Sequence, residues 1–418
     1  MPLRMRAIPR VWVDLKTTEV MSAVCGLLNV PKARGNSSRK RFENEFAQFI
    51  GVKHAVSFTN CRSALYFILK GLNFSQGDEV ILPAFTFWVD AAVVELAGLK
   101  PVFVDVDPAS MNIDPAQIEQ AVTKRTKAIL LAHLNGLPVD MGAVMSLARR
   151  YNLRVIEDSA RSCGARCVGK RVGSFDIGAF SFGYGKSFYG FGGGMVTSDD
   201  TEFIERLRQL KVDFHQVTVA GMYKIILKGC LLKFLNTPSL HGFTLFPCAY
   251  RYEINHDTRF NSWFKIKKPH LTSVPEQFKT DMFHLQTKFC FRQIRTIDQS
   301  NAVRQKYLKI LNNEFAHLPE VRIPVSPANR ENINVHYAVS VERKRELQVF
   351  LMENGIDAQD ESAEDVTQME RFKKYATALY PNAAKLHQRI VYLPCHPCLS
   401  EDDVRRMAAR VKEFYGRG

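Results

Sequence analysis

The sequence predicts an α/β protein in which a largely parallel sheet, covered by helices on both faces, is followed by a smaller α+β domain. From about residue 52 to 200, short β-rich runs alternate with helix-length segments, which is the pattern of βαβ units. The remaining third lacks this alternation and contains a long helical segment. At 418 residues the chain also exceeds the roughly 250–300 residues at which a single core stops growing, so two domains are expected.

Strands and helices are expected to alternate regularly in the first domain. In chain order they are a strand over His54–Phe58, a helix from Arg62, a strand over Glu79–Leu82, a helix over Trp88–Gly98, and strands over Pro101–Val106, Ala128–Ala132, Arg154–Glu157 and Ala179–Phe182. In open sheets of this kind, ligands bind beyond the carboxyl ends of the strands. Asp158 and Lys186 closely follow two of these strands, so both are expected where a ligand lies.

The last third predicts a helix over Pro275–Asn312, a strand over Val335–Val341, and helices over Lys344–Asn354 and Glu401–Tyr415. Between the two parts, Val217–Phe264 is aromatic and basic and shows no strand–helix alternation. We therefore divide the chain into a large domain over residues 1–216, an insertion over 217–264 and a small α+β domain over 265–418.

Composition is that of an ordinary globular protein, 46% hydrophobic and 24% charged, which argues against a disordered or fibrous chain. The net charge of +15 favours anionic partners, but no basic and aromatic module or helix-turn-helix pattern indicates nucleic acid. Residues 1–15 lack the continuous apolar run of a secretory signal, so a cytoplasmic location is expected.

The nine cysteines are scattered and odd in number, which suits reduced thiols better than a disulfide framework. Cys395 and Cys398 lie close together in the sequence, as do Cys163 and Cys167. A zinc site needs a second ligand pair at a recognisable spacing, and none is evident here. We expect structural thiols and no metal.

A glycine-rich segment, Phe180–Gly194, carries Lys186 just after a predicted buried strand. A lysine that is partly desolvated in such a turn has a lowered pKa, which makes its amine available for carbonyl chemistry. Ser181 offers a hydroxyl, and successive N–H groups of such a loop can bind a phosphate. The alternative is a solvated lysine in a surface turn, without a chemical role.

Asp158 stands at the end of a predicted buried strand, in the segment Val155–Gly164. A carboxylate in this position is costly to ionise unless it is paired, and a protonated pyridine nitrogen is one such partner. That pairing keeps pyridoxal phosphate (PLP) an electron sink. The alternative makes Asp158 the N-cap of a following helix.

Two further segments also lie at expected strand ends. In Asn60–Leu65, the positive end of a helix and its free N–H groups form an anion site, to which Arg62 can add contacts with a phosphate. The alternative is a solvated arginine in the first helical turn. In Pro83–Asp90, Phe87 either stacks on a planar ring or packs in the core.

These four segments, in this order, resemble the DegT/StrS family of PLP-dependent sugar aminotransferases. The likeness covers about residues 40–205 and is carried by Phe42-Glu-Asn-Glu-Phe-Ala, Gly77–Pro83, Pro101–Asp107, Glu157-Asp158 and Gly173–Val196. After residue 275 it is looser and includes Leu393-Pro-Cys-His-Pro. The resemblance implies a fold type I PLP-transferase, with a mixed, mostly parallel seven-stranded sheet and a smaller C-terminal domain.

The resemblance also implies residue roles. Lys186 would carry PLP as a Schiff base and move protons, Asp158 would pair with the ring nitrogen, and Phe87 would stack on the ring. Ser181 and the turn Cys61-Arg62 would contact the cofactor phosphate. Arg161, which stands where the family commonly has Gln or His, would bind the phenolate oxygen of PLP or an anionic substrate.

As implied by the family, the protein would be a homodimer with active sites at the subunit interface. It would move an amino group from an amino acid such as glutamate to a keto-sugar linked to a nucleotide or a lipid, in polysaccharide, glycolipid or antibiotic sugar biosynthesis. Family members that act as sugar dehydratases lack the lysine, whereas Lys186 is present. The alternative function is a diverged, non-catalytic PLP fold that acts as a membrane-associated assembly subunit.

This chain departs from the family pattern in two segments. The phosphate turn, usually Ser-Gly-Thr, reads Asn60-Cys61-Arg62, and the Asn-Tyr-Arg segment normally contributed by a neighbouring subunit is not recognisable. The insertion stands near the place of that missing segment.

The insertion contains an apolar stretch, Met222–Leu235, interrupted by Lys224, Lys228 and Lys233. It is too short and too broken to span a membrane. It either lies in the interface of an anionic membrane, with Phe243, Phe246 and the segment 263–268 extending the surface, or it packs across the dimer interface or covers the active site.

Overall fold

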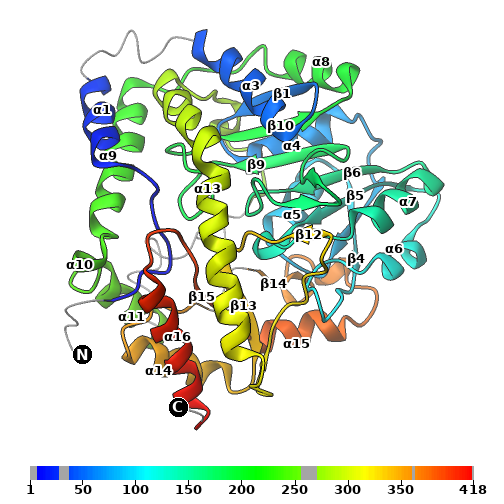
Figure 1. The fold of residues 1–418 in the computed structure, drawn as a ribbon. Helices are drawn as coiled ribbons and strands as arrows, with labels where there is room; N and C mark the ends of the chain where they lie inside the picture. Colours follow the sequence, from blue (N-terminus) through cyan, green and yellow to red (C-terminus); the bar gives the residue numbers. More distant parts are fainter. Residues whose placement is uncertain (1–6, 28–36, 256–270, 360–362, 417–418) are drawn as a thin grey trace.

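The computed structural model describes residues 7–27, 37–255, 271–359 and 363–416. Figure 1 shows a large sheet with its helices in one half of the molecule and the C-terminal strands and helices in the other half. The long helix α13 (His284–Phe315) runs from one half to the other (Figure 1).

A seven-stranded sheet forms the first half, in the order β1-β10-β9-β6-β5-β2-β4. These strands are β1 (His54–Phe58), β2 (Glu79–Pro83), β4 (Lys100–Val104), β5 (Thr126–Ala132), β6 (Arg154–Asp158), β9 (Ile177–Ser181) and β10 (Gly194–Ser198). Only β10 runs antiparallel to its neighbours, β1 and β9. The mixed, mostly parallel seven-stranded sheet is therefore confirmed.

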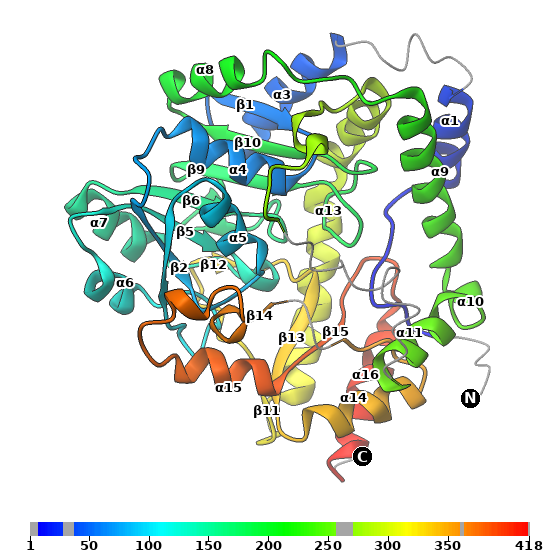
Figure 2. The same ribbon diagram turned by 180° about the vertical axis from the view of Figure 1, so that it is seen from behind.

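Helices cover both faces of this sheet, because its strands are apolar on both sides. One face packs against α4 (Cys61–Gly71), α5 (Val89–Leu96) and α8 (Thr201–Leu210) (Figure 2). The other face packs against α3 (Ser37–Ile50), α6 (Pro115–Ala121), α7 (Met141–Tyr151) and the first part of α13. Short strands β3 (Phe85–Thr86), β7 (Arg166–Cys167) and β8 (Lys170–Arg171) lie in the connections.

The C-terminal half has its own antiparallel sheet in the order β11-β13-β15. Its strands are β11 (Val321–Arg322), β13 (His336–Val341) and β15 (Ile390–Pro394), and its helices are α14 (Lys344–Glu353), α15 (Pro381–Arg389) and α16 (Glu401–Phe414). Two further strands, β12 (Arg330–Glu331) and β14 (Glu364–Asp365), pair with β7 and β3 of the first half. The predicted strand and two of the predicted helices of this region agree with β13, α14 and α16, and the domain boundary itself stays a prediction.

The predicted helix over Pro275–Asn312 was wrong at its start, because α13 begins only at His284. Glu276–Lys279 form a single 3-10 turn, and Thr280 pairs with His215 in an isolated β-bridge. Asp281 is held by ion pairs with Arg39 and Lys211. These contacts come from residues far away in the sequence, so the local helical pattern did not reveal them.

The segment predicted as an insertion folds into three helices, α9 (Val219–Leu235), α10 (Pro238–His241) and α11 (Leu245–Asn255). Helix α9 lies beside α1 (Thr17–Leu27) in both views (Figures 1 and 2). Two residues that were expected on the surface of the insertion are turned inward. Phe246 of α11 is buried, and Lys233 of α9 lies with its Nζ 3.2 Å from the ring centroid of Trp12. The aromatic and basic residues at 263–268 lie outside the described residues.

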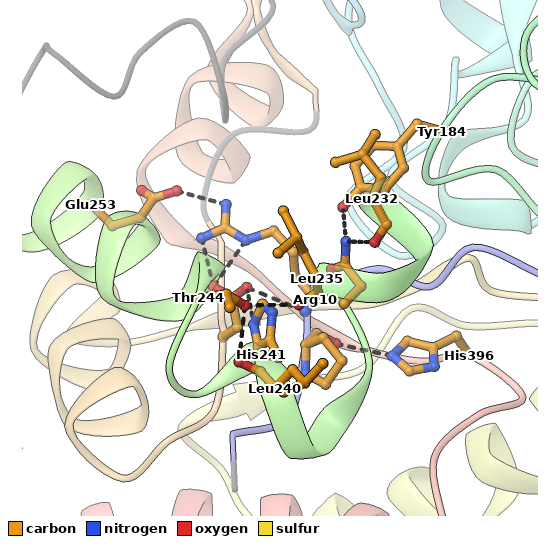
Figure 3. Close-up of polar contacts among 12 residues, drawn as sticks. Arg10, Tyr184, Leu232, Leu235, Leu240, His241, Thr244, Glu253 and His396 are labelled. Atoms are coloured by element: carbon orange, nitrogen blue, oxygen red, sulfur yellow. Dashed lines mark hydrogen bonds and ion pairs between the residues drawn. The ribbon is translucent and has the colours of Figure 1, made fainter. Parts of the chain in front are cut away.

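The N-terminal segment is anchored in the C-terminal half by Arg10 (Figure 3). Its guanidinium donates to Asp357 Oδ1 from Nε and Nη2, at 2.9 and 2.7 Å, and to Glu253 Oε1 of α11 at 2.8 Å. His241 of α10 also lies near Asp357, with 3.3 Å between Nε2 and Oδ2. Burial acts to raise the pKa of Asp357, but Arg10 and His241 outweigh it and hold the pKa below its ordinary value. One arginine thus ties three segments together.

Arg10→Ala is expected to lower the free energy of unfolding by about 3 kcal/mol, because it leaves two buried carboxylates without their cation. Chemical denaturation of the full chain measures this. Arg150→Ala is the matched control, since Arg150 forms an exposed ion pair with Glu119 and its loss should change little. Equal stability of the two variants would contradict the anchoring role.

Candidate active site

All seven residues singled out from the sequence line one cavity of about 860 Å³ at the carboxyl edge of the sheet. They are Cys61, Arg62, Phe87, Asp158, Arg161, Ser181 and Lys186. The parallel strands β2, β6 and β9 end at this edge, and β1 runs in the same direction, so the residues that follow them converge. Another cavity, of about 560 Å³ beside α14, contains none of these residues.

Lys186 lies in the loop between β9 and β10 and is partly buried. This loop closes tightly on the start of α4, since a Cβ atom at Gly194 would lie 2.5 Å from the carbonyl carbon of Asn60. Burial first, and then Arg161, lower the pKa of Lys186 to about 8, against the opposing effect of Asp158. The uncharged, nucleophilic amine is therefore more populated near neutral pH than in an ordinary lysine.

Asp158 is the last residue of β6 and is 8% exposed. Its Oδ1 accepts a hydrogen bond from the backbone N–H of Ala160 at 2.8 Å, and the thiol of Cys61 lies 3.9 Å from the same oxygen. Turns follow Asp158 up to β7, with no helix over the described residues 159–165, so the N-cap alternative is wrong. The carboxylate instead faces the cavity.

The N-terminus of α4 forms one end of the cavity. Asn60 caps this helix by accepting from Ser63 N–H at 2.9 Å. The other first N–H groups of a helix have no intrahelical acceptor, so they and the helix dipole favour an anion. Arg62 lines the cavity beside them and is partly buried, which places a cation at the same end.

The remaining predicted residues complete the wall. Phe87 follows β3 and is partly buried, and its ring centroid lies 6.0 Å from that of Trp88. Phe85, in contrast, is fully buried in the core. Ser181 ends β9, and Arg161 lies in the turn after Asp158. Phe87 is thus available to a ligand in the cavity.

Sequence reasoning missed the wall that the insertion provides. Lys228 and Leu232 of α9 line the cavity together with Asn236, which caps the end of this helix, and with His241 and Leu245. Asn236 Nδ2 donates to the hydroxyl of Tyr184, two residues before Lys186, at 3.0 Å (Figure 3). The insertion therefore covers part of the site, which agrees with the alternative that it covers the active site.

Helix α9 also packs directly on the loop that carries Lys186. A Cβ atom at Gly229 would lie 2.4 Å from the ring of Phe191 and 2.5 Å from the hydroxyl of Tyr189, so only glycine permits this approach. Met222 and Ile226 of the same helix are buried with these two aromatic side chains.

His133 also lines the cavity, directly after β5, so the strand-end rule would have found it. Its Nε2 lies 3.0 Å from Glu157 Oε2, and its Nδ1 accepts from Val139 N–H at 3.0 Å. Glu157 in turn accepts from the N–H groups of Gly173 and Phe175. These bonds give His133 a structural role in holding the loops around the edge.

The cavity fits PLP by the chemistry of its side chains. Lys186 would supply an amine for the aldehyde, Asp158 a carboxylate for the ring nitrogen, and Arg62 with the α4 N-terminus a positive end for the phosphate. The volume lies within the usual range of ligand sites and leaves room for a substrate beside the cofactor. The described residues contain no group of three side chains suited to a metal ion.

Comparisons with known proteins agree with this reading. The solved structure of S. venezuelae DesV superimposes with a TM-score of 0.76 at 27% identity, covering 98% of this chain and 100% of that one. A pleiotropic regulatory protein of Geobacillus stearothermophilus is 30% identical over 90% of this chain and 89% of its own length. A dTDP-3-amino-3,6-dideoxy-alpha-D-galactopyranose transaminase of Aneurinibacillus thermoaerophilus is 28% identical over 89% of each chain.

The fold and the cavity define a PLP-dependent aminotransferase of fold type I. The sequence model of the DegT/DnrJ/EryC1/StrS aminotransferase family matches residues 17–224 and 265–412, and the chain belongs to this family. The expectations of family, enzyme class and cofactor are confirmed, and the non-catalytic alternative finds no support in these comparisons. Residues 225–264, which separate the two matched segments, fall within the predicted insertion.

Proposed function

We propose that the protein transfers an amino group from an amino acid, such as glutamate, to a keto-sugar carried by a nucleotide or a lipid. The convergence of Lys186, Asp158 and Arg62 on one cavity carries this proposal. The transaminase from Aneurinibacillus thermoaerophilus, whose name is that of a dTDP-sugar enzyme, supports a sugar as the acceptor. The product would enter polysaccharide, glycolipid or antibiotic sugar biosynthesis.

When bound, PLP supplies an aldehyde that condenses with amines and a protonated ring that withdraws electrons. Lys186 is the proposed attachment point, and its Nζ is placed to accept the proton from the amine-bearing carbon of the donor. The Asp158 carboxylate holds the proton on the ring nitrogen. Phe87 would pack on the ring, Ser181 and the Cys61-Arg62 turn would bind the phosphate, and Arg161 would hold the phenolate oxygen or an anionic substrate group.

A single-turnover reaction tests the acceptor class. The protein, converted to its aminated cofactor form with glutamate, is mixed with a panel of nucleotide-linked keto-sugars and the products are identified by mass spectrometry. An amino-sugar nucleotide formed in amounts equal to the enzyme supports the proposal. Release of amine only to keto acids would refute a sugar as the acceptor.

Arg62→Ala is expected to weaken PLP binding roughly tenfold or more, because a charged partner of a phosphate contributes on the order of 1.5–3 kcal/mol. Titration of the cofactor-free variant with PLP measures the Kd. Arg206→Ala is the control, since this arginine lies on α8, donates a hydrogen bond to the carbonyl of Gly71 and does not line the cavity. An unchanged Kd for Arg62→Ala would place its charge away from the phosphate.

We also propose a homodimer with the active site at the subunit interface, as the family resemblance suggests, and a cytoplasmic location, as the sequence of residues 1–15 suggests. Light scattering on the purified protein gives its mass and tests the dimer.

The outward face of α9 is the proposed contact with an anionic membrane. Leu227, Leu231 and Phe234 are each about half exposed there, and Lys224 is exposed beside them. Lysine stems can reach headgroups while the apolar side chains enter the acyl boundary. None of the helices in the described ranges is long and apolar enough to cross a membrane.

Co-sedimentation with anionic vesicles tests this contact. Deleting α9 would expose the core around Met222 and Ile226, so the better variant changes only the outward side chains, Leu227, Leu231 and Phe234, to serine. We expect the wild type to pellet with vesicles at low salt and the variant to remain in the supernatant. Equal recovery of both proteins in the supernatant would refute the membrane contact and would leave the proposed transamination untouched.

A further inference from the structure

A second carboxyl group, that of Asp90, lies buried behind Asp158 and has no role in the function proposed above. Asp90 stands in the first turn of α5 and is 0% exposed. Its Oδ2 accepts a hydrogen bond from the hydroxyl of Thr86 at 2.7 Å. Its Oδ1 finds no donor among the described residues. A charged carboxylate in such a place would be strongly destabilising.

Asp158 is the ionisable neighbour that acts most strongly on Asp90: its charge, and a side-chain hydrogen bond that the two carboxyl groups can share, both raise the pKa of Asp90. Two carboxylates in contact within a poorly solvated site cannot both be ionised, so the pair must hold one proton. A proton on Oδ1 of Asp90 also accounts for the missing donor there, because that oxygen then donates rather than accepts.

The surroundings decide which carboxyl group keeps the proton. Asp158 has the backbone N–H of Ala160 and the thiol of Cys61 as donors, and it borders the cavity that Lys186 and Arg161 line. Within the described part of the chain, the side chain of Asp90 accepts only from the Thr86 hydroxyl. Burial first, and then the charge of Asp158, raise the pKa of Asp90 well above its ordinary value, while Lys186 opposes them. Cys61 is the other titratable group nearby, and burial raises the pKa of its thiol.

We propose that Asp90 is a positioning residue whose protonated carboxyl donates a hydrogen bond to the Asp158 carboxylate and holds it toward the cavity. This inference rests on the proposed role of Asp158. A hydrogen bond from Asp90 would stabilise the carboxylate form of Asp158, the form that would pair with the ring nitrogen of the cofactor. It also restrains the rotamer of Asp158, together with the contacts from Ala160 N–H and the Cys61 thiol to Oδ1.

The first test needs no turnover. A protonated carboxyl has its own infrared C=O stretching band, distinct from that of a carboxylate. We expect this band in the full-length wild-type protein near neutral pH and its loss in Asp90→Asn, with and without bound PLP. Identical infrared spectra of the two proteins in this region would overturn the proposal.

The second test uses the pH dependence of unfolding. A carboxyl with a raised folded-state pKa stabilises the fold fully below its unfolded pKa of about 4 and loses that contribution as the pH rises toward the folded value. Relative to Asp90→Asn, the unfolding equilibrium constant of the wild type should therefore rise by up to about tenfold per pH unit from pH 5. Parallel pH profiles would count against a protonated Asp90.

The third test separates positioning from simple packing. Asp90→Asn keeps an N–H donor of the same shape and should hold kcat within a few-fold, whereas Asp90→Leu should lower kcat roughly tenfold with KM little changed. A Leu variant that melts earlier but turns over normally when folded would reduce Asp90 to a packing residue. Full activity of Asp158→Asn would instead refute the proposed role of Asp158, which keeps the two failures distinct.

Discussion

Lys186→Ala is expected to lower transamination by about 10³-fold or more and to remove the visible absorbance of lysine-bound PLP. The amine is the proposed anchor of the cofactor and the proposed proton carrier, and acid–base groups alone contribute about 10²–10⁴-fold. The side chain lies in a loop and borders a cavity, so its removal leaves the core intact. The unfolding temperature should remain close to that of the wild type.

Lys170→Ala serves as the control for this variant, because Lys170 is an exposed lysine on the two-residue strand β8. It should keep both the absorbance and the rate. A Lys186→Ala protein with wild-type turnover would contradict the central assignment, and one that is unfolded by circular dichroism would call for Lys186→Arg, which retains the charge and much of the volume but cannot attach PLP.

The second large effect is expected from Asp158, whose loss should lower kcat by about 10²–10³-fold while PLP still binds. The physical reason is that the ring nitrogen loses the anion that keeps it protonated. Asp158→Asn is the sharper variant, since the amide oxygen can still accept from Ala160 N–H and preserve the turn. A Kd for PLP that changes little, beside a strongly reduced kcat, is the expected pattern.

Asp114→Asn is a matched control, because Asp114 Oδ1 accepts from Ala116 N–H at 2.9 Å in the same two-residue spacing, but Asp114 is the N-cap of α6 and does not line the cavity. It should leave the rate unchanged. If Asp158→Asn turned over within a few-fold of the wild type, Asp158 would be assigned to the turn and not to the chemistry.

The sequence predicted the sheet and the place of the site because both depend on local patterns. Strand–helix alternation identified most of the sheet strands, and the rule that ligands bind at strand ends located Asp158 and Lys186. The roles of the seven cavity residues rest on the family resemblance and stay predictions.

What the sequence did not predict depends on contacts between distant segments. The start of α13 follows from the ion pairs of Asp281, and the inward position of Lys233 follows from Trp12, more than two hundred residues earlier. Asp90 was read only as the end of an aromatic segment, since its contact with Asp158 exists only in the folded chain. No periodicity within α9 shows that this helix faces a cavity.

The close approach of α9 at Gly229 bears on how this enzyme can be re-engineered. A helix that lines the cavity and also packs closely on Tyr189 and Phe191 cannot be shortened, rotated or exchanged for that of a relative without disturbing the loop that carries Lys186. A change in α9 that alters the size of the cavity is therefore expected to alter the conformation of the loop that carries Lys186 as well. Directed evolution toward a larger acceptor should therefore find paired changes, one in α9 and one in residues 189–191, more often than isolated ones.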